Sequence, residues 1–139
     1  MKHIVNDFKF RLPALNANVD VCVGAISSFV KTYNPSVEEL GDIRISVTEA
    51  FANCVEHAYK DHPDKQNAFV YVSIRLYDNN VVSIEISDNG CGFKFETRRN
   101  ECIGFTIMNE FMDSVIAKSK VGKGTTILMR KELRSHNIQ

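Results

Sequence analysis

The 139-residue chain predicts an α/β two-layer sandwich, in which helices cover one face of a mixed, largely antiparallel sheet. Helical periodicity of apolar residues marks two long segments of the N-terminal half, and alternating apolar and polar residues mark several shorter segments. The order is β-α-α-β-β-α-β-β, and a sheet with helices on one face is the natural packing for that order. We expect one domain over residues 1–139, with its core at about residues 8–131.

Composition narrows the class of protein. The chain is 44% hydrophobic and 24% charged, which is ordinary for a globular domain. Its formal net charge is zero and no basic stripe is visible, so nucleic acid is not an expected partner. No segment approaches the ~20 apolar residues of a membrane span, and the N-terminus lacks the apolar core of a signal peptide. We therefore expect a cytoplasmic protein without membrane contact.

The N-terminal elements follow from local pattern. Alternation over residues 3–12 predicts a strand that Pro13 stops. Apolar residues at helical spacing predict a first helix near residues 17–33, and Asn16 or Asn18 is the expected cap.

The second helix, roughly residues 36–60, has the clearest pattern in the chain. Ser36, followed three residues later by Glu39, predicts a capping box at its start. One apolar stripe at helical spacing is expected to pack on the sheet. That stripe consists of Leu40, Ile43, Val47, Ala50, Phe51, Cys54 and Ala58.

A polar stripe borders the apolar one on the same helix. Glu49, Asn53 and His57 are four residues apart, so they share a face that can line a cleft. Asparagine has poor helix propensity, which favours a functional role for Asn53. A zinc site at these residues is disfavoured, because asparagine is a poor zinc ligand. For Glu49 a solvated surface position is the alternative interpretation.

The remaining elements are expected as strands over 69–77 and 81–87, a short helix over 104–112, and strands over 114–119 and 125–131. Residues 60–67 and 93–102 read as loops, and residues 133–139 as a frayed tail. For Arg98 and Arg99 in the second of these loops two interpretations stay open, namely solvated side chains or contacts with phosphate.

The turn after the 81–87 strand carries an acid and two glycines. Asp88, shielded from water, can accept a hydrogen bond from a ring amine, and Gly90 and Gly92 allow close approach of the backbone to a ligand. Gly104 opens a helix whose free N–H groups favour an anion, and Thr125 offers a hydroxyl near the same place. Taken alone, the turn has an alternative interpretation as an ordinary strand exit.

The four cysteines show no C-x-x-C pair and no metal-ligand spacing. Cys22 and Cys54 lie on apolar helix faces, where a free thiol behaves as a small hydrophobe. Cys91 and Cys102 flank a loop and can approach each other, but reduced thiols are expected in a cytosolic chain. Whether these two ever pair is left open.

Four segments in fixed order resemble the Bergerat-type ATPase fold of histidine kinases, gyrase, Hsp90 and MutL, and most closely the bacterial anti-sigma factor serine kinases. They are residues 47–53 with His57, residues 86–92, residues 104–113 and residues 124–126. The resemblance runs from about Phe8 to Lys131.

The resemblance implies ATP and Mg²⁺ as cofactors. Asn53 matches the family's ligand of Mg²⁺, and Glu49 matches the proposed general base for an attacking serine hydroxyl. His57 can reach a phosphate oxygen, with a plain surface histidine as the alternative.

The other matching positions surround the base and the phosphates. Asp88 matches the adenine-reading aspartate, and Thr125 would support it through a hydroxyl or a water. Gly90 and Gly92 would leave room for adenine and for lid movement, while Gly104 would let backbone amides meet phosphate.

The implied function is an anti-sigma factor that binds a sigma factor and phosphorylates a serine of an anti-anti-sigma partner. Family members are commonly homodimers, here through the N-terminal strand and first helix. A histidine-kinase type of enzyme is disfavoured, because no phosphoacceptor domain is expected ahead of this module.

One departure from the family supports a second hypothesis. Only Phe93 to Ile103 separate the aspartate turn from Gly104, and Cys102 replaces a family glycine there. So short a lid covers the triphosphate less well, which suggests a nucleotide-gated partner-binding module with little or no kinase turnover.

Overall fold

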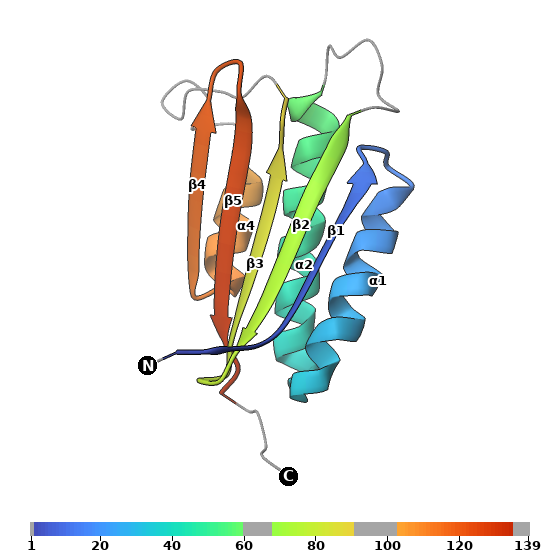
Figure 1. The fold of residues 1–139 in the computed structure, drawn as a ribbon. Coiled ribbons are helices and arrows are strands. Elements are labelled where there is room, and N and C mark those ends of the chain that lie inside the picture. Colours follow the sequence, from blue (N-terminus) through green and yellow to red (C-terminus); the bar gives the residue numbers. More distant parts are fainter. Residues whose placement is uncertain (1, 60–67, 91–102, 135–139) are drawn as a thin grey trace.

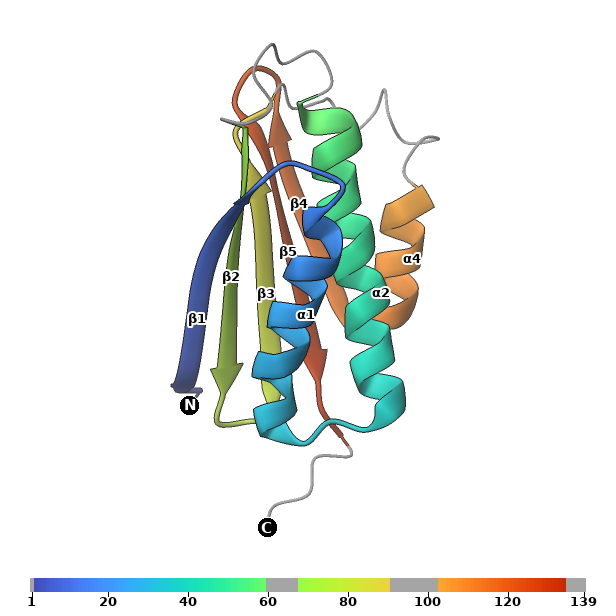
Figure 2. The same cartoon turned by 90° about the vertical axis from the view of Figure 1, so that its right-hand side faces the viewer.

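The computed structural model describes residues 2–59, 68–90 and 103–134. Figures 1 and 2 show one sheet with one layer of helices on one of its faces. The elements in chain order are β1 (Ile4–Pro13), α1 (Asn18–Val30), η1 (Lys31–Tyr33), α2 (Val37–Asn53), η2 (Cys54–Ala58), β2 (Phe69–Tyr77), β3 (Val81–Asp88), α4 (Ile103–Phe111), β4 (Ser114–Lys120) and β5 (Gly124–Glu132). The predicted two-layer fold is confirmed.

The sheet has five strands in the order β1-β2-β3-β5-β4. Each neighbouring pair of these strands is antiparallel, where the sequence predicted a mixed and largely antiparallel sheet. The chain leaves β3, forms α4 and the edge strand β4, and returns as β5 between β4 and β3 (Figure 1). This topology places the end of β3 beside the start of β5, where Asp88 pairs with Thr125.

Helix α1 starts differently from the prediction. The predicted asparagine cap was wrong, because the N-cap position is Ala17, which makes no side-chain capping bond. Asn18 is instead the first helical residue, and its side-chain Nδ2 donates to the Pro13 carbonyl at 2.9 Å. The asparagine therefore ties the helix to the preceding strand, of which Pro13 is the last residue.

Helix α2 starts as predicted. The Ser36 hydroxyl accepts from the Glu39 N–H at 3.0 Å, and the Glu39 carboxylate accepts from the Ser36 N–H at 3.0 Å, which completes the capping box. Its apolar stripe packs on the sheet, and Phe51 is fully buried. In the described ranges, no helix is long and apolar enough to span a membrane.

The C-terminal end of this helix departs from a regular α-helix. The α-helical part ends at Asn53, and Cys54–Ala58 form a π-helical turn where the sequence predicted continuous α-helix to about residue 60. A π turn is wider than an α turn, so it changes where the last side chains point, and such turns are frequent at functional sites.

Candidate functional site

Three elements end or begin together at one end of the molecule. Figure 1 shows the last residues of β3, the first residues of β5 and the C-terminal end of the α2–η2 helix at this end. Asp88 is the last residue of β3 and is only 5% exposed. A buried carboxylate costs free energy unless donors surround it, so its partners define the site.

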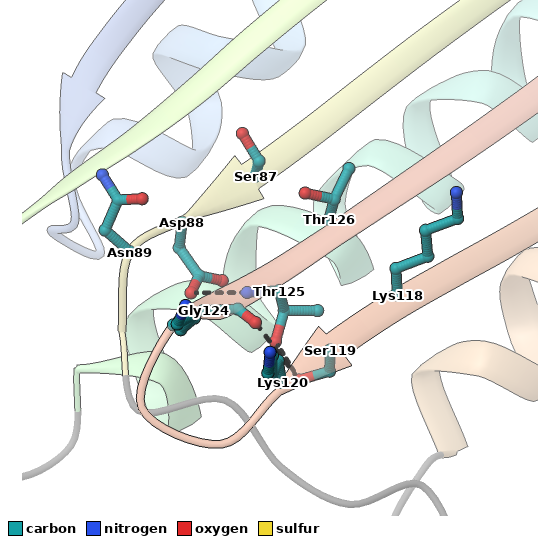
Figure 3. A pocket seen from close by; sticks show the side chains of 10 residues that line it. Ser87, Asp88, Asn89, Lys118, Ser119, Lys120, Gly124, Thr125 and Thr126 are labelled. Atoms are coloured by element: carbon teal, nitrogen blue, oxygen red, sulfur yellow. Dashed lines mark hydrogen bonds between the residues drawn. The ribbon is translucent and has the colours of Figure 1, made fainter.

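The Asp88 carboxylate has three donors among the described residues. Its Oδ1 accepts from the Gly90 N–H at 2.9 Å and from the Thr125 N–H at 3.3 Å, the second of which is drawn in Figure 3. Its Oδ2 accepts from the Cys54 thiol at 3.3 Å. Burial raises the pKa of Asp88 above its ordinary value, and the three donors oppose that shift. The direction of the carboxylate is thus fixed by donors from the turn after β3, from β5 and from the π turn.

Two glycines allow this close arrangement. A Cβ on Gly90 would lie 2.1 Å from the Ala58 carbonyl oxygen, so the turn after β3 packs directly against the π turn. A Cβ on Gly124 would lie 2.1 Å from the Asp88 carbonyl oxygen, and Gly124 also has a φ of 101°. The sequence attributed Gly90 to room for a ligand, and the structure adds a steric requirement within the protein.

Tyr59 anchors the same turn from the helix side. Its hydroxyl donates to the Phe69 carbonyl at 2.7 Å and accepts from the Asn89 N–H at 2.8 Å. Burial raises the pKa of Tyr59 to about 12, so the hydroxyl keeps its proton. The tyrosine therefore joins the residue after Asp88 to the first residue of β2.

Thr125 contacts Asp88 through its backbone, and support through its hydroxyl or a water stays a prediction. The Thr125 backbone N–H donates to Asp88 Oδ1, whereas the Thr125 hydroxyl lies 2.8 Å from the Ser119 hydroxyl. These residues line a pocket with a volume of about 290 Å³. Figure 3 draws the side chains that line it. The lining of this pocket also includes three basic residues, Lys118, Lys120 and Lys123.

The polar stripe of the helix reaches the same end of the molecule. Asn53 and Glu49 are partly exposed, and no hydrogen bond joins either side chain to another described residue. Asn53 is the last residue of α2 and directly precedes Cys54, whose thiol donates to Asp88, so its backbone belongs to the same end of the helix as the carboxylate site. A free carboxamide oxygen suits a hard cation such as Mg²⁺.

His57 belongs to the π turn, so it does not continue the α-helical spacing that the sequence implied. Its side chain is 41% exposed and its Nε2 lies 3.8 Å from the exposed Glu56 carboxylate. Within the described ranges, no group of three or more His, Cys, Asp or Glu side chains could hold a metal ion. The fit to Mg²⁺ therefore depends on Asn53 together with oxygen atoms that a ligand brings.

The remaining predicted site residues belong to α4 or lie outside the described residues. Gly104 is the second residue of α4, at the N-terminal end where free N–H groups lie. Gly92, Arg98 and Arg99 lie outside the described residues, as does the question of a Cys91–Cys102 pair.

Sequence reasoning missed four residues of the site. Cys54 was assigned to the core only, Ser119 and Tyr59 received no role, and Gly124 was noted as part of a motif without a steric reason. Local pattern could have pointed only to Gly124, which precedes Thr125 in that motif. Cys54 and Tyr59 act through contacts with residues 34 and 30 positions away in the chain, whereas Ser119 contacts Thr125 across one hairpin.

Comparisons with known sequences agree with this geometry. The sequence profile of the histidine kinase-like ATPase domain matches residues 12–131. The anti-sigma F factor of Geobacillus sp. (strain WCH70) is 33% identical over 138 residues, which cover 91% of this chain and 92% of that protein. The anti-sigma F factor of Priestia megaterium is 31% identical over 140 residues, which cover 92% and 93% respectively.

Solved structures share the fold. The structure of the RsbU and RsbW domains of Rv1364c from Mycobacterium tuberculosis matches with a TM-score of 0.71 at 17% identity, over 93% of this chain and 33% of that chain. The SiaB-SiaC complex from Pseudomonas aeruginosa matches with a TM-score of 0.70 at 10% identity, over 91% and 89%. The profile match and the anti-sigma F relatives together show that this chain belongs to the histidine kinase-like ATPase domain family.

Proposed function

We propose that the chain is an anti-sigma regulatory factor that uses ATP to phosphorylate a serine on an anti-anti-sigma partner. The observation that carries the proposal is the buried Asp88 carboxylate, held by fixed donors and reached from the helix that bears Asn53. The likeness to anti-sigma F factors over 91% of the chain supports the regulatory part.

The proposed binding mode follows the layout of the site. Asp88 accepts a hydrogen bond from the adenine amine, and the triphosphate extends toward the helix end with Asn53 and His57. The N-terminal N–H groups of α4, where Gly104 lies, favour the negative phosphates. Asn53 would hold Mg²⁺, which supplies neutralisation of phosphate charge when it is bound.

Phosphoryl transfer needs a proton acceptor near the partner's serine. Glu49 lies one turn before Asn53 on α2, and its carboxylate is free of hydrogen bonds to other described residues. We assign it as general base: it takes the serine proton while the hydroxyl oxygen bonds to the γ-phosphorus and ADP leaves. The other contributions are positioning and charge neutralisation.

A phosphotransfer assay tests this assignment. The purified protein is incubated with Mg-ATP and a candidate anti-anti-sigma protein, and phosphoserine is measured by mass spectrometry. Glu49→Gln should lower the rate by about 100-fold or more, whereas Glu110→Gln, an exposed acid at the far end of α4, should leave it unchanged. Equal rates in the wild type and Glu49→Gln would contradict the general-base role.

The short lid, Phe93 to Ile103, favours the second candidate function, a nucleotide-gated binding module. In that case ATP changes partner affinity by binding one state better than the other. Glu49→Gln would then leave ATP-dependent partner exchange intact, which separates the two functions.

The proposed partners are a sigma factor, the anti-anti-sigma protein and a second copy of this chain. For the homodimer the support lies at β1, which is an edge strand of the sheet. Val5 on β1 is 55% exposed and Val21 on α1 is 53% exposed. Apolar residues on an edge strand and the neighbouring helix are suited to burial against another copy.

A further inference from the structure

The Asp88 carboxylate has few acceptor positions left for a ligand. A carboxylate offers about four lone-pair positions, two on each oxygen. Two N–H donors occupy Oδ1, and the Cys54 thiol occupies one position on Oδ2. When the donors from the described residues are counted, one acceptor position therefore remains, and it is on Oδ2.

Cys54 is well suited to hold that oxygen. The residue is 3% exposed and lies in the π turn directly after Asn53. Its thiol donates to Asp88 Oδ2 at 3.3 Å, and both side chains are buried. The π turn and the close packing of Gly90 on Ala58 keep the thiol and the carboxylate together.

We propose that Cys54 is a positioning residue for base recognition: its thiol holds one lone pair of Asp88 Oδ2 and aims the other at the amine of the bound base. This inference rests on the proposed binding of ATP. An amine donates to the remaining lone pair, whereas a ring carbonyl at the same place offers only another acceptor. Without the thiol, the described residues leave the carboxylate without a donor from the helix side, so the hydrogen bond from the amine is less well directed.

The test compares ATP with inosine triphosphate, which carries a carbonyl where adenine has its amine. Calorimetric titration gives both affinities for the wild type, Cys54→Ala and Cys54→Val. Both variants lack the donor, and valine keeps the buried volume. We expect ATP affinity to fall by about three- to tenfold, the range of one ordinary hydrogen bond, with inosine triphosphate affinity unchanged. Cys54→Ser, whose hydroxyl donates to the same oxygen, should restore the wild-type ratio.

Cys22→Ala is the matched control. Cys22 is also a buried free cysteine, but it lies on α1 and is not among the described residues that donate a hydrogen bond to Asp88. It should leave the ratio of the two affinities unchanged. A purely structural effect of Cys54 would weaken both nucleotides alike.

The outcomes separate this inference from the proposed function. If folded Cys54→Ala and Cys54→Val both keep the wild-type ratio, or if Cys22→Ala lowers it equally, the positioning role is wrong while ATP binding stands. If the wild type binds neither nucleotide, the proposed function and this inference both fail.

Discussion

Gly124 lies so close to Asp88 that a Cβ on it would come within 2.1 Å of the Asp88 carbonyl oxygen. Because φ at Gly124 is 101°, alanine there would also be strained in its backbone. We predict that Gly124→Ala lowers the free energy of unfolding by about 3 kcal/mol. It should also weaken ATP binding, since Asp88 must shift. Urea unfolding and calorimetry measure the two effects.

The control is in the same turn. Gly122 has a φ of 81°, and a Cβ built on it meets no atom within 4 Å. Gly122→Ala should therefore lower the free energy of unfolding only through the strained positive φ, by about 1–2 kcal/mol, and leave ATP binding unchanged. Equal effects of the two substitutions would show that the contact with Asp88 has no energetic weight.

Two other glycines are expected to limit stability. Gly24 in α1 and Gly41 in α2 lie in helices, and a Cβ on either meets no atom within 4 Å. Alanine there reduces the entropy of the unfolded chain, so each substitution should raise the free energy of unfolding by about 0.5–1 kcal/mol. A loss of stability in thermal or urea unfolding would contradict this prediction.

Lys131 joins three elements beneath the helices. Its Nζ lies 3.2 Å from Asp42 Oδ2 on α2 and donates to the Phe111 carbonyl of α4 at 2.8 Å, and Lys131 itself is on β5. Lys131→Met leaves both acceptors without this donor, so we expect a loss of about 2–3 kcal/mol in unfolding free energy. Urea unfolding of the two proteins measures it.

The Arg134–Asp113 pair provides the comparison. Its atoms are 3.9 Å apart and the arginine side chain is 74% exposed, so solvent screens the attraction. Arg134→Met should change the unfolding free energy by less than about 0.5 kcal/mol. If both substitutions cost the same, burial of the Lys131 pair is not what gives it strength.

The charge on Asp88 is expected to lower the free energy of unfolding, although the proposed binding of ATP needs that charge. Burial raises its pKa above the ordinary 3.8, so the folded protein binds this proton more tightly than the unfolded chain does. Stability then falls as pH rises from about 3.8 through the raised value, and stays lower above it. Asp88→Asn removes this loss, so its stability advantage over the wild type should be larger at about pH 7 than at about pH 4. An equal difference at both pH values would exclude a destabilising charge at Asp88.

The proposed homodimer predicts that new charges on the β1–α1 surface separate the subunits. Val5→Asp and Val21→Asp should shift sedimentation from dimer toward monomer, because a charge buried in an interface is costly. Val37→Asp is the control, since Val37 is 92% exposed and is on α2 rather than on β1 or α1. A dimer that withstands both test substitutions would place the interface elsewhere.

Local sequence pattern predicted most of the fold. The strands and helices follow from periodicity, and the Ser36–Glu39 capping box is a purely local signal that the structure confirms. The N-cap of α1 was wrong because Asn18 uses its side chain on Pro13, a contact that competes with capping. The antiparallel pairing of β3 with β5 depends on chain return around β4, which local pattern does not report.

Several residues of the candidate site could be predicted from the sequence, but most of the contacts between them could not. Asp88, Gly90 and Thr125 do meet, although their roles in binding stay predictions. The π turn was missed because apolar spacing shows which face is buried, not which carbonyl each N–H reaches. Cys54 was assigned to the core for the same reason: its partner Asp88 is 34 residues away.

The proposed function requires that Asp88 and Asn53 form a site for Mg-ATP. Calorimetric titration of ATP and ADP, with and without Mg²⁺, on the wild type and Asp88→Asn tests it most directly. We expect Mg²⁺-dependent binding to the wild type and its loss in Asp88→Asn, which presents a donor where the base amine needs an acceptor. No binding to the wild type at roughly millimolar nucleotide, or equal binding by both proteins, would contradict it.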